Sequence, residues 1–151
     1  MKAEPGARDV ARVPDSFLDL VQCPPVAVLS TVMPSGAPHS SVVWCDYEEP
    51  YLRVNTMRGF RKERNMRANP KVTLLCFDPA EPLRYLELRG RVVGMTEDGA
   101  GEHLDRLASN YAGRPVSYFG DAIPAEYADT EIPVLCRILP NQVIARDWTR
   151  W

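Results

Sequence analysis

The sequence predicts an antiparallel β-barrel with one or two helices outside it. Two observations favour this fold class: short runs of β-branched and aromatic residues follow one another at hairpin-length spacing, and the 14 prolines lie between these runs rather than inside them. A third observation argues against a parallel α/β sheet. The chain shows no strand–helix–strand alternation, no G-x-G-x-x-G and no G-x-x-x-x-G-K-[ST], so neither a dinucleotide-binding sheet nor a P-loop domain is supported.

The expected strands are runs of alternating or continuous apolar residues that end at turn residues. We expect strands over residues 26–32, 38–47, 51–56, 71–77, 84–93 and 134–148, the last being one strand or a pair interrupted at Pro140. The first three are expected to be neighbours in a meander. Gly90 interrupts the alternation of the strand that contains it, which predicts a bulge or a close approach of another backbone.

Two segments have helical rather than strand spacing. Residues 59–69 form an amphipathic segment that ends at Asn69-Pro70, which predicts a short helix. Residues 98–111 place apolar side chains three and four positions apart, which predicts a surface helix with His103 on its exposed side. Residues 112–132 are rich in glycine, proline, tyrosine and acid, which predicts a loop with a helical turn near residues 124–127.

Length and composition limit the possible classes of protein. The 151 residues suit one domain spanning 1–151, with residues 1–15 as an N-terminal extension. Eighteen basic and 20 acidic residues give a net charge of -2, which argues against a nucleic-acid or anionic-membrane partner. No apolar run of 18 residues or secretory leader is present, so we expect a cytoplasmic protein.

The cysteines and histidines do not have the spacing of a metal site. The four cysteines are far apart, with no C-x-x-C, and the only histidines are His39 and His103, so no metal ligands are assigned and four buried thiols are expected. No Ser-His-Asp order, paired-carboxylate pattern or H-E-x-x-H is present, so no side chain is assigned as catalytic. His39 is a weaker candidate for polarising a substrate carbonyl or contacting a cofactor, and a solvent-exposed strand end is its plainer interpretation. Tyr47 and Tyr85 are weaker candidates for donating a proton, and half-buried packing is their plainer interpretation.

Positive charge gathers in one short segment. Residues 58–71 contain six basic residues and one acid, Glu63. The basic residues are Arg58, Arg61, Lys62, Arg64, Arg67 and Lys71. This cluster directly follows a strand and crosses Gly59 into a helix, which is the arrangement that binds a phosphate or carboxylate. The alternative is a solvated basic helix face.

Three segments of the chain resemble a known superfamily in order and spacing. They are VAVLSTVMPSGAPHSSVVW, YLRVNTMRGFRKERNMRANPKVTLLCF and RYLELRGRVV. Together they are similar to the split β-barrel superfamily that includes pyridoxamine 5'-phosphate oxidase and the flavin/deazaflavin oxidoreductases. The likeness covers residues 26–95 and, more weakly, 133–148. It is greatest to the branch that uses the deazaflavin coenzyme F420, whose members commonly show T-x-R-G-x-R-K-x-R-N-x-x-x-x-P, as residues 56–70 do here.

The resemblance implies a mainly β fold, an FMN-binding split barrel with a few peripheral helices, and a cofactor site. The residues that would face the ring are Ser41, Val43, Trp44, Thr56 and Met57. The residues that would hold the phosphate are Arg61 and Lys62, assisted by Arg58 and Arg64. In the oxidase relatives, the strand that matches residues 84–90 reaches the cofactor of the other protomer. The resemblance therefore implies a homodimer with sites at the subunit interface, in which Arg84 and Tyr85 act in trans.

Two departures limit the likeness. Phe60 lies where many F420-binding relatives have an arginine, so one phosphate or tail contact is missing or comes from Arg58. The chain also lacks the C-terminal R-L-x-P by which the vitamin oxidases hold pyridoxal phosphate, and it ends instead in ARDWTRW, whose tryptophans suggest an anchor or an interface. Pyridoxamine oxidation is therefore not expected.

The expected function is hydride transfer from reduced F420 to an activated double bond or a quinone-type small molecule. F420 is favoured over FMN because its oligoglutamate tail carries several carboxylates, which Arg64, Arg67 and Lys71 could bind. An FMN-dependent oxidoreductase on the same barrel remains an alternative. A non-catalytic protein that binds a cofactor or a tetrapyrrole remains another.

Overall fold

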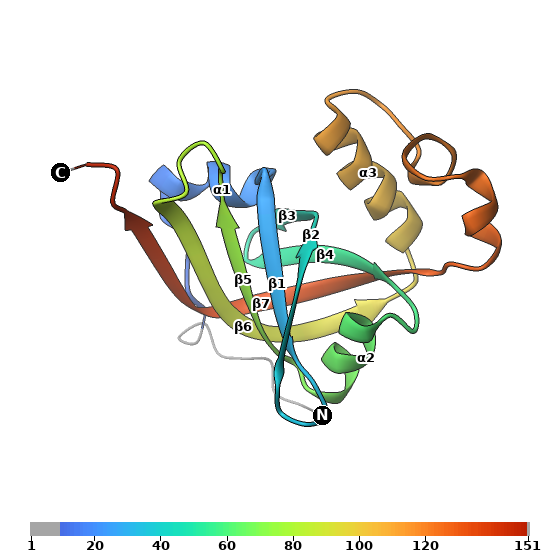
Figure 1. The fold of residues 1–151 in the computed structure, drawn as a ribbon, viewed down its shortest axis with the longest axis horizontal. Helices are drawn as coiled ribbons and strands as arrows, with labels where there is room; N and C mark the ends of the chain where they lie inside the picture. Colours follow the sequence, from blue (N-terminus) through green and yellow to red (C-terminus); the bar gives the residue numbers. More distant parts are fainter. Residues whose placement is uncertain (1–9, 151) are drawn as a thin grey trace.

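A curled, seven-stranded antiparallel sheet forms the body of the protein (Figure 1), in a computed structural model that describes residues 10–150. The strand order is β2-β1-β5-β6-β7-β4-β3. The strands are β1 (Val26–Val32), β2 (Pro38–Val43), β3 (Cys45–Glu48), β4 (Tyr51–Met57), β5 (Lys71–Phe77), β6 (Arg84–Thr96) and β7 (Pro133–Asp147). Every pairing is antiparallel, so the predicted fold class, a mainly β split barrel with a few peripheral helices, is confirmed.

In the described part of the chain, three helices and several short turns lie outside the sheet (Figure 1). The helices are α1 (Asp19–Gln22), α2 (Arg61–Ala68) and α3 (Ala100–Ala112). The turns are Asp15–Phe17, Tyr118–Ala122 and Ala125–Asp129. Both predicted helices and the predicted helical turn after Pro124 are confirmed, whereas α1 was not expected. No helix in the described range is long and apolar enough to cross a membrane.

The end of the expected N-terminal extension packs against the barrel. Val13 is buried, and the Ala11 amide donates a hydrogen bond to the Pro140 carbonyl at 3.0 Å. Residues 1–9 of that extension lie outside the described residues, as does Trp151 at the other end of the chain.

The expected meander of the first three strands is wrong, because residues 38–47 do not form one strand. Trp44 separates β2, which pairs with β1, from β3, which pairs with β4. The free edge of β4 pairs instead with β7, so β2 and β3 occupy opposite ends of the strand order. In the sequence, the strand-like pattern of residues 38–47 continues through Trp44, so it does not indicate that the strand ends there. The chain thus passes at Trp44 from one edge of the curled sheet to the other.

Gly90 lies where two backbones come unusually close, as predicted. The register of β6 against β7 shifts between Arg89 and Gly90, and a Cβ atom built on Gly90 would lie 2.3 Å from the Leu139 carbonyl oxygen. No side chain fits in that space. The strand β7 continues through Pro140, which resolves the choice between one strand and two in favour of one.

The core lies inside the curl of the sheet. Its largest fully buried side chains include Leu29, Leu52, Leu74, Leu86, Leu88 and Ile138. Three cysteines belong to this core, but Cys23 is exposed, so the expectation of four buried thiols is wrong for that residue. Cys23 directly follows α1, at a surface bend that leads into β1, and hydropathy does not distinguish such a site from a core position.

Candidate functional site

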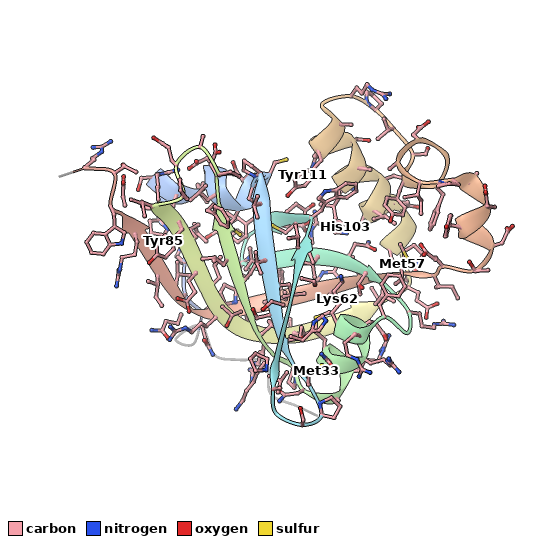
Figure 2. The ribbon with its side chains drawn as sticks, in the orientation of Figure 1. Met33, Met57, Lys62, Tyr85, His103 and Tyr111 are labelled. Carbon is pink, nitrogen blue, oxygen red and sulfur yellow. The ribbon has the colours of Figure 1, made fainter. Side chains whose placement is uncertain are left out.

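A cavity of about 240 Å³ lies between the end of β2, the end of β4, the start of α2 and one side of α3. Its lining residues are Val42, Val43, Trp44, Asn55, Thr56, Met57, Phe60, Lys62, Leu104, Leu107 and Tyr118. Five of the eleven predicted site residues are among them. Figure 2 shows Met57 and Lys62 in the region between α2 and α3.

An aromatic group forms one wall of this cavity. The Trp44 ring stacks on Tyr111 of α3, with centroids 5.3 Å apart and planes 16° apart. The edge of Tyr118 meets Trp44 at 6.0 Å and 89°. These two contacts fix the plane of the indole and leave a flat apolar surface beside the cavity.

Lys62 brings a partly buried cation to the cavity. Its Nζ atom donates to the Ser41 hydroxyl at 3.4 Å, which brings predicted Ser41 beside the cavity although it is not a lining residue. Burial lowers the pKa of Lys62, because the ammonium loses hydration there. An anion bound next to Lys62 would restore the stability of the charged form.

Only part of the basic cluster is available to a ligand. Arg58 donates from Nε to Glu97 at 3.0 Å, and Arg67 pairs with Glu63, whose carboxylate is 2% exposed. Within residues 10–150, no carboxylate forms an ion pair with the remaining basic residues of the cluster. These are Arg61, Lys62, Arg64 and Lys71.

The helix α2 is held against the sheet by residues of its second half. Asn65 is buried and donates from Nδ2 to the Thr31 hydroxyl at 3.0 Å, and Met66 packs into the core. The amides of the first helical turn have no partner within the helix. They lie beside Lys62 and half-buried Arg61, so anion-binding groups of two kinds meet at this end of α2.

Arg84 and Tyr85 do not join this cavity within one chain. The Arg84 guanidinium donates to Asp19 at 2.8 Å from both Nη atoms and lies 4.8 Å from the Phe17 ring centroid. Figure 2 shows Tyr85 at the far end of the sheet from Met57 and Lys62. A role for this pair in trans requires a second subunit and stays a prediction. The weaker candidates His39 and Tyr47 do not line the cavity either.

A buried charged network, which sequence reasoning missed, lies beneath α3. Arg53 donates to Asp46 through Nε at 2.8 Å and Nη2 at 2.7 Å, and His103 Nε2 lies 3.1 Å from Asp46 Oδ1. Burial raises the pKa of Asp46, but the hydrogen bonds from His103 and Arg53 outweigh it, so the Asp46 pKa lies below its usual range. The carboxylate is therefore ionised at neutral pH.

The expected exposure of His103 is wrong, since the side chain is 3% exposed. The spacing of His103 from the apolar residues of the helix already indicates that it is buried. His103 is three positions after Ala100 and four before Leu107, both of which are buried, so it lies on the apolar face of α3.

Two polar atoms at the cavity are left without partners. Asn55 and Thr56 both line it, and neither Asn55 Oδ1 nor Thr56 Oγ1 has a hydrogen-bond partner within residues 10–150. Successive side chains of a strand point to opposite faces, so Thr56 shares the face of core residue Val54, whereas Asn55 shares the face of Met57. Buried polar groups are almost always paired, so the unpaired Asn55 oxygen is a candidate contact for a ligand. Apolar walls, unpaired polar atoms and a neighbouring cation fit a flat heteroaromatic group that carries a phosphate.

The comparisons with known proteins agree with this fold. A family model described as pyridoxamine 5'-phosphate oxidase matches residues 13–132. The curled sheet is thus that of a split-barrel protein, and the chain belongs to the pyridoxamine 5'-phosphate oxidase-like family. A search of curated proteins found no match.

Several solved structures share the fold. One titled "F420 Reductase" is 31% identical, with a TM-score of 0.73 over 87% of this chain and 98% of that one. A conserved hypothetical protein from Mycobacterium tuberculosis is 22% identical, with a TM-score of 0.66 over 96% and 90%. HutZ, the haem storage protein from Vibrio cholerae, is 20% identical, with a TM-score of 0.57 over 80% and 85%. The last two show a likeness of fold alone.

Proposed function

We propose that this protein binds coenzyme F420 in the cavity beside α2 and acts as a reductase of small molecules with an activated double bond or a quinone. The observation that carries the proposal is the position of Lys62, a half-buried cation that lines an aromatic-walled cavity and has no carboxylate partner among residues 10–150. When bound, reduced F420 supplies the hydride. The 31% identity to a structure titled "F420 Reductase" supports this choice of coenzyme.

In this proposal the chain's own residues bind and orient the reactants. Trp44, Met57 and Leu104 form walls that exclude water and fix the plane of the ring. Arg61 and Lys62 hold the phosphate with the first amides of α2, and Arg64 and Lys71 extend the positive surface toward an acidic tail. No side-chain acid is assigned to the reaction.

We also propose that a second copy of the chain completes the site. Val42 at the sheet edge is 69% exposed and Phe60 is 45% exposed, although both line the cavity. An apolar rim of this kind is typical of a surface that a partner covers. The homodimer is the arrangement in which Arg84 and Tyr85 of one subunit would reach the cofactor of the other.

FMN is the second candidate, and one observation favours it. Two of the six basic residues of the cluster, Arg58 and Arg67, are already paired with Glu97 and Glu63. This leaves fewer cations for an acidic tail than the sequence suggests, whereas a single phosphate needs only Arg61 and Lys62.

A parallel titration with F420 and FMN tests the proposal. We expect the wild-type protein to quench or shift F420 fluorescence at micromolar concentrations and to bind F420 more tightly than FMN. Arg61→Ala combined with Lys62→Ala should weaken F420 binding by at least about tenfold. Arg12→Ala combined with Arg150→Ala removes the same charge at exposed positions and should leave binding unchanged. If the protein binds FMN but not F420, the proposed coenzyme becomes FMN. If it binds neither coenzyme, both the F420 and the FMN proposals are refuted.

A further inference from the structure

We propose that Asn55 is a specificity-determining hydrogen-bond acceptor in the cavity, and that Asp46 and His103 fix its amide in the accepting orientation. The matching ligand group is an N–H or O–H donor on a flat heteroaromatic ring. The identity of the ligand rests on the proposed function. The orientation of the Asn55 amide depends only on contacts within the chain.

The carbonyl of Ala100 defines which way the Asn55 amide points. Asn55 Nδ2 lies 2.8 Å from the Ala100 carbonyl oxygen at the start of α3. A carbonyl oxygen only accepts hydrogen bonds, so the amide nitrogen must face it. The reverse orientation would place two oxygens at that distance with no proton between them.

The same nitrogen fixes the tautomer of His103. Asn55 Nδ2 also lies 3.2 Å from His103 Nδ1, and because the amide donates, Nδ1 must accept and carries no proton. The proton of the neutral ring is then on Nε2, which donates to Asp46 Oδ1 at 3.1 Å. The direction of donation therefore runs from Asn55 through His103 to Asp46.

Asp46 is a rigid end to this chain of hydrogen bonds. Its carboxylate faces Arg53 on the neighbouring strand β4, and both Asp46 oxygens accept from that guanidinium. Arg53 also pairs with Glu48 at 2.5 Å. Because Asp46, Arg53 and His103 are all buried, none of them turns away to solvent without leaving a buried charge or polar group unpaired.

The remaining atom of the amide is the one that a ligand would use. Both amide protons of Asn55 are committed to α3, and Oδ1 has no partner within residues 10–150. Asn55 and Met57 lie two positions apart on β4, hence on the same face, and both line the cavity. An acceptor locked there favours a ring N–H or ring hydroxyl, as on a flavin or deazaflavin, and disfavours a carbonyl or carboxylate at that point.

The test has one arm without ligand and one with it. Long-range ¹H–¹⁵N NMR of the wild-type protein should show His103 as the neutral tautomer protonated at Nε2. In F420 titrations, Asn55→Leu should weaken binding about tenfold, whereas Gln142→Leu, on the exposed part of β7, should leave it unchanged. Asn55→Ala replaces Asn55→Leu if thermal unfolding shows that the leucine variant does not fold.

His103 is a positioning residue in this account, and its conservative variant separates that role from a merely structural one. The amide introduced by His103→Gln would still donate to Asp46 and accept from Asn55, so affinity should stay within about twofold of wild type. His103→Leu should weaken binding about tenfold. A His103 ring protonated at Nδ1, or wild-type affinity in the Asn55 variant, would overturn the inference. If the wild-type protein binds neither F420 nor FMN, the proposed function is refuted. The NMR measurement of the His103 tautomer would then be the test of the inference.

Discussion

Trp44 stacks on Tyr111 at 5.3 Å, and this contact joins the crossing point between β2 and β3 to the C-terminal half of α3. The Tyr111 hydroxyl is also within 3.5 Å of the Cys45 amide, which donates to it, and burial raises the pKa of Tyr111 above its usual range. One aromatic pair therefore holds the crossing between β2 and β3 against α3, and its indole lines the candidate cofactor cavity.

Trp44→Ala should destabilise the protein and damage the cavity together. Loss of the indole removes the stack on Tyr111 and leaves a void, at a cost of about 3 kcal/mol in the free energy of unfolding. Trp148→Ala is the control, because Trp148 is 52% exposed and should cost less than about 1 kcal/mol. Urea unfolding of both variants gives the comparison. Equal stability losses would show that the stack contributes nothing specific.

Gly90→Ala should be among the most damaging small substitutions in the chain. The new Cβ would lie 2.3 Å from the Leu139 carbonyl oxygen and 2.8 Å from the Pro140 Cα, both backbone atoms, so β6 and β7 must separate. We expect a loss of about 3 kcal/mol or more, measured by thermal or urea unfolding. Gly94→Ala, in the same strand with nothing within 4 Å of its Cβ, should change stability by less than about 1 kcal/mol. Similar losses for both would contradict the close approach at Gly90.

Asp46→Asn should change both stability and its dependence on acid. At pH 7 the variant leaves the buried Arg53 with a weakened partner, and we expect a loss of about 3 kcal/mol. The pKa of Asp46 is lower in the folded state than its unfolded value of about 3.9, so its ionised form stabilises the fold above that pH. This contribution is lost as the pH falls below about 4 and through the folded pKa.

The measurement for Asp46 is the free energy of unfolding between pH 7 and pH 3. Wild type should lose more stability over this range than Asp46→Asn does. Asp129→Asn, on the exposed turn after Pro124, is the charge-matched control and should follow the wild-type profile. If Asp46→Asn and wild type have parallel profiles, Asp46 does not contribute to the acid dependence.

One thiol of four should react rapidly in the native protein. Cys23 is exposed, whereas Cys45, Cys76 and Cys136 are buried, and burial raises the pKa of Cys136 to about 12. A thiol-specific chromogenic reagent at pH 8 should therefore modify one cysteine quickly and the others only after unfolding. Cys23→Ser should abolish the fast phase, and its persistence in that variant would contradict the burial of the other three.

Local sequence patterns predicted most of the individual elements but not how the edges of the sheet are arranged. The two helices, the bulge at Gly90 and most strands follow from periodicity and turn residues, which act over a few positions. The break at Trp44 depends on β4 pairing with β7, a contact across about eighty residues, and no local pattern encodes it. The likeness of residues 56–70 to F420-binding relatives identified the part of the chain that borders the cavity.

The structure brings some of the predicted site residues together and leaves others apart. Val43, Trp44, Thr56 and Met57 line one cavity, but Arg58 is paired with Glu97, which lies far away in the sequence. A net charge counted over a segment does not reveal such pairing. Asn55 was not among the predicted site residues, because its contacts with α3 arise only in the folded chain.

The most direct test of the central claim is a crystal structure of the protein with bound F420. We expect the ring to lie in the cavity beside Trp44 and Met57, with its phosphate within hydrogen-bond distance of Lys62 Nζ or the Arg61 guanidinium. A coenzyme bound elsewhere, with Lys62 bonded only to Ser41, would contradict the claim.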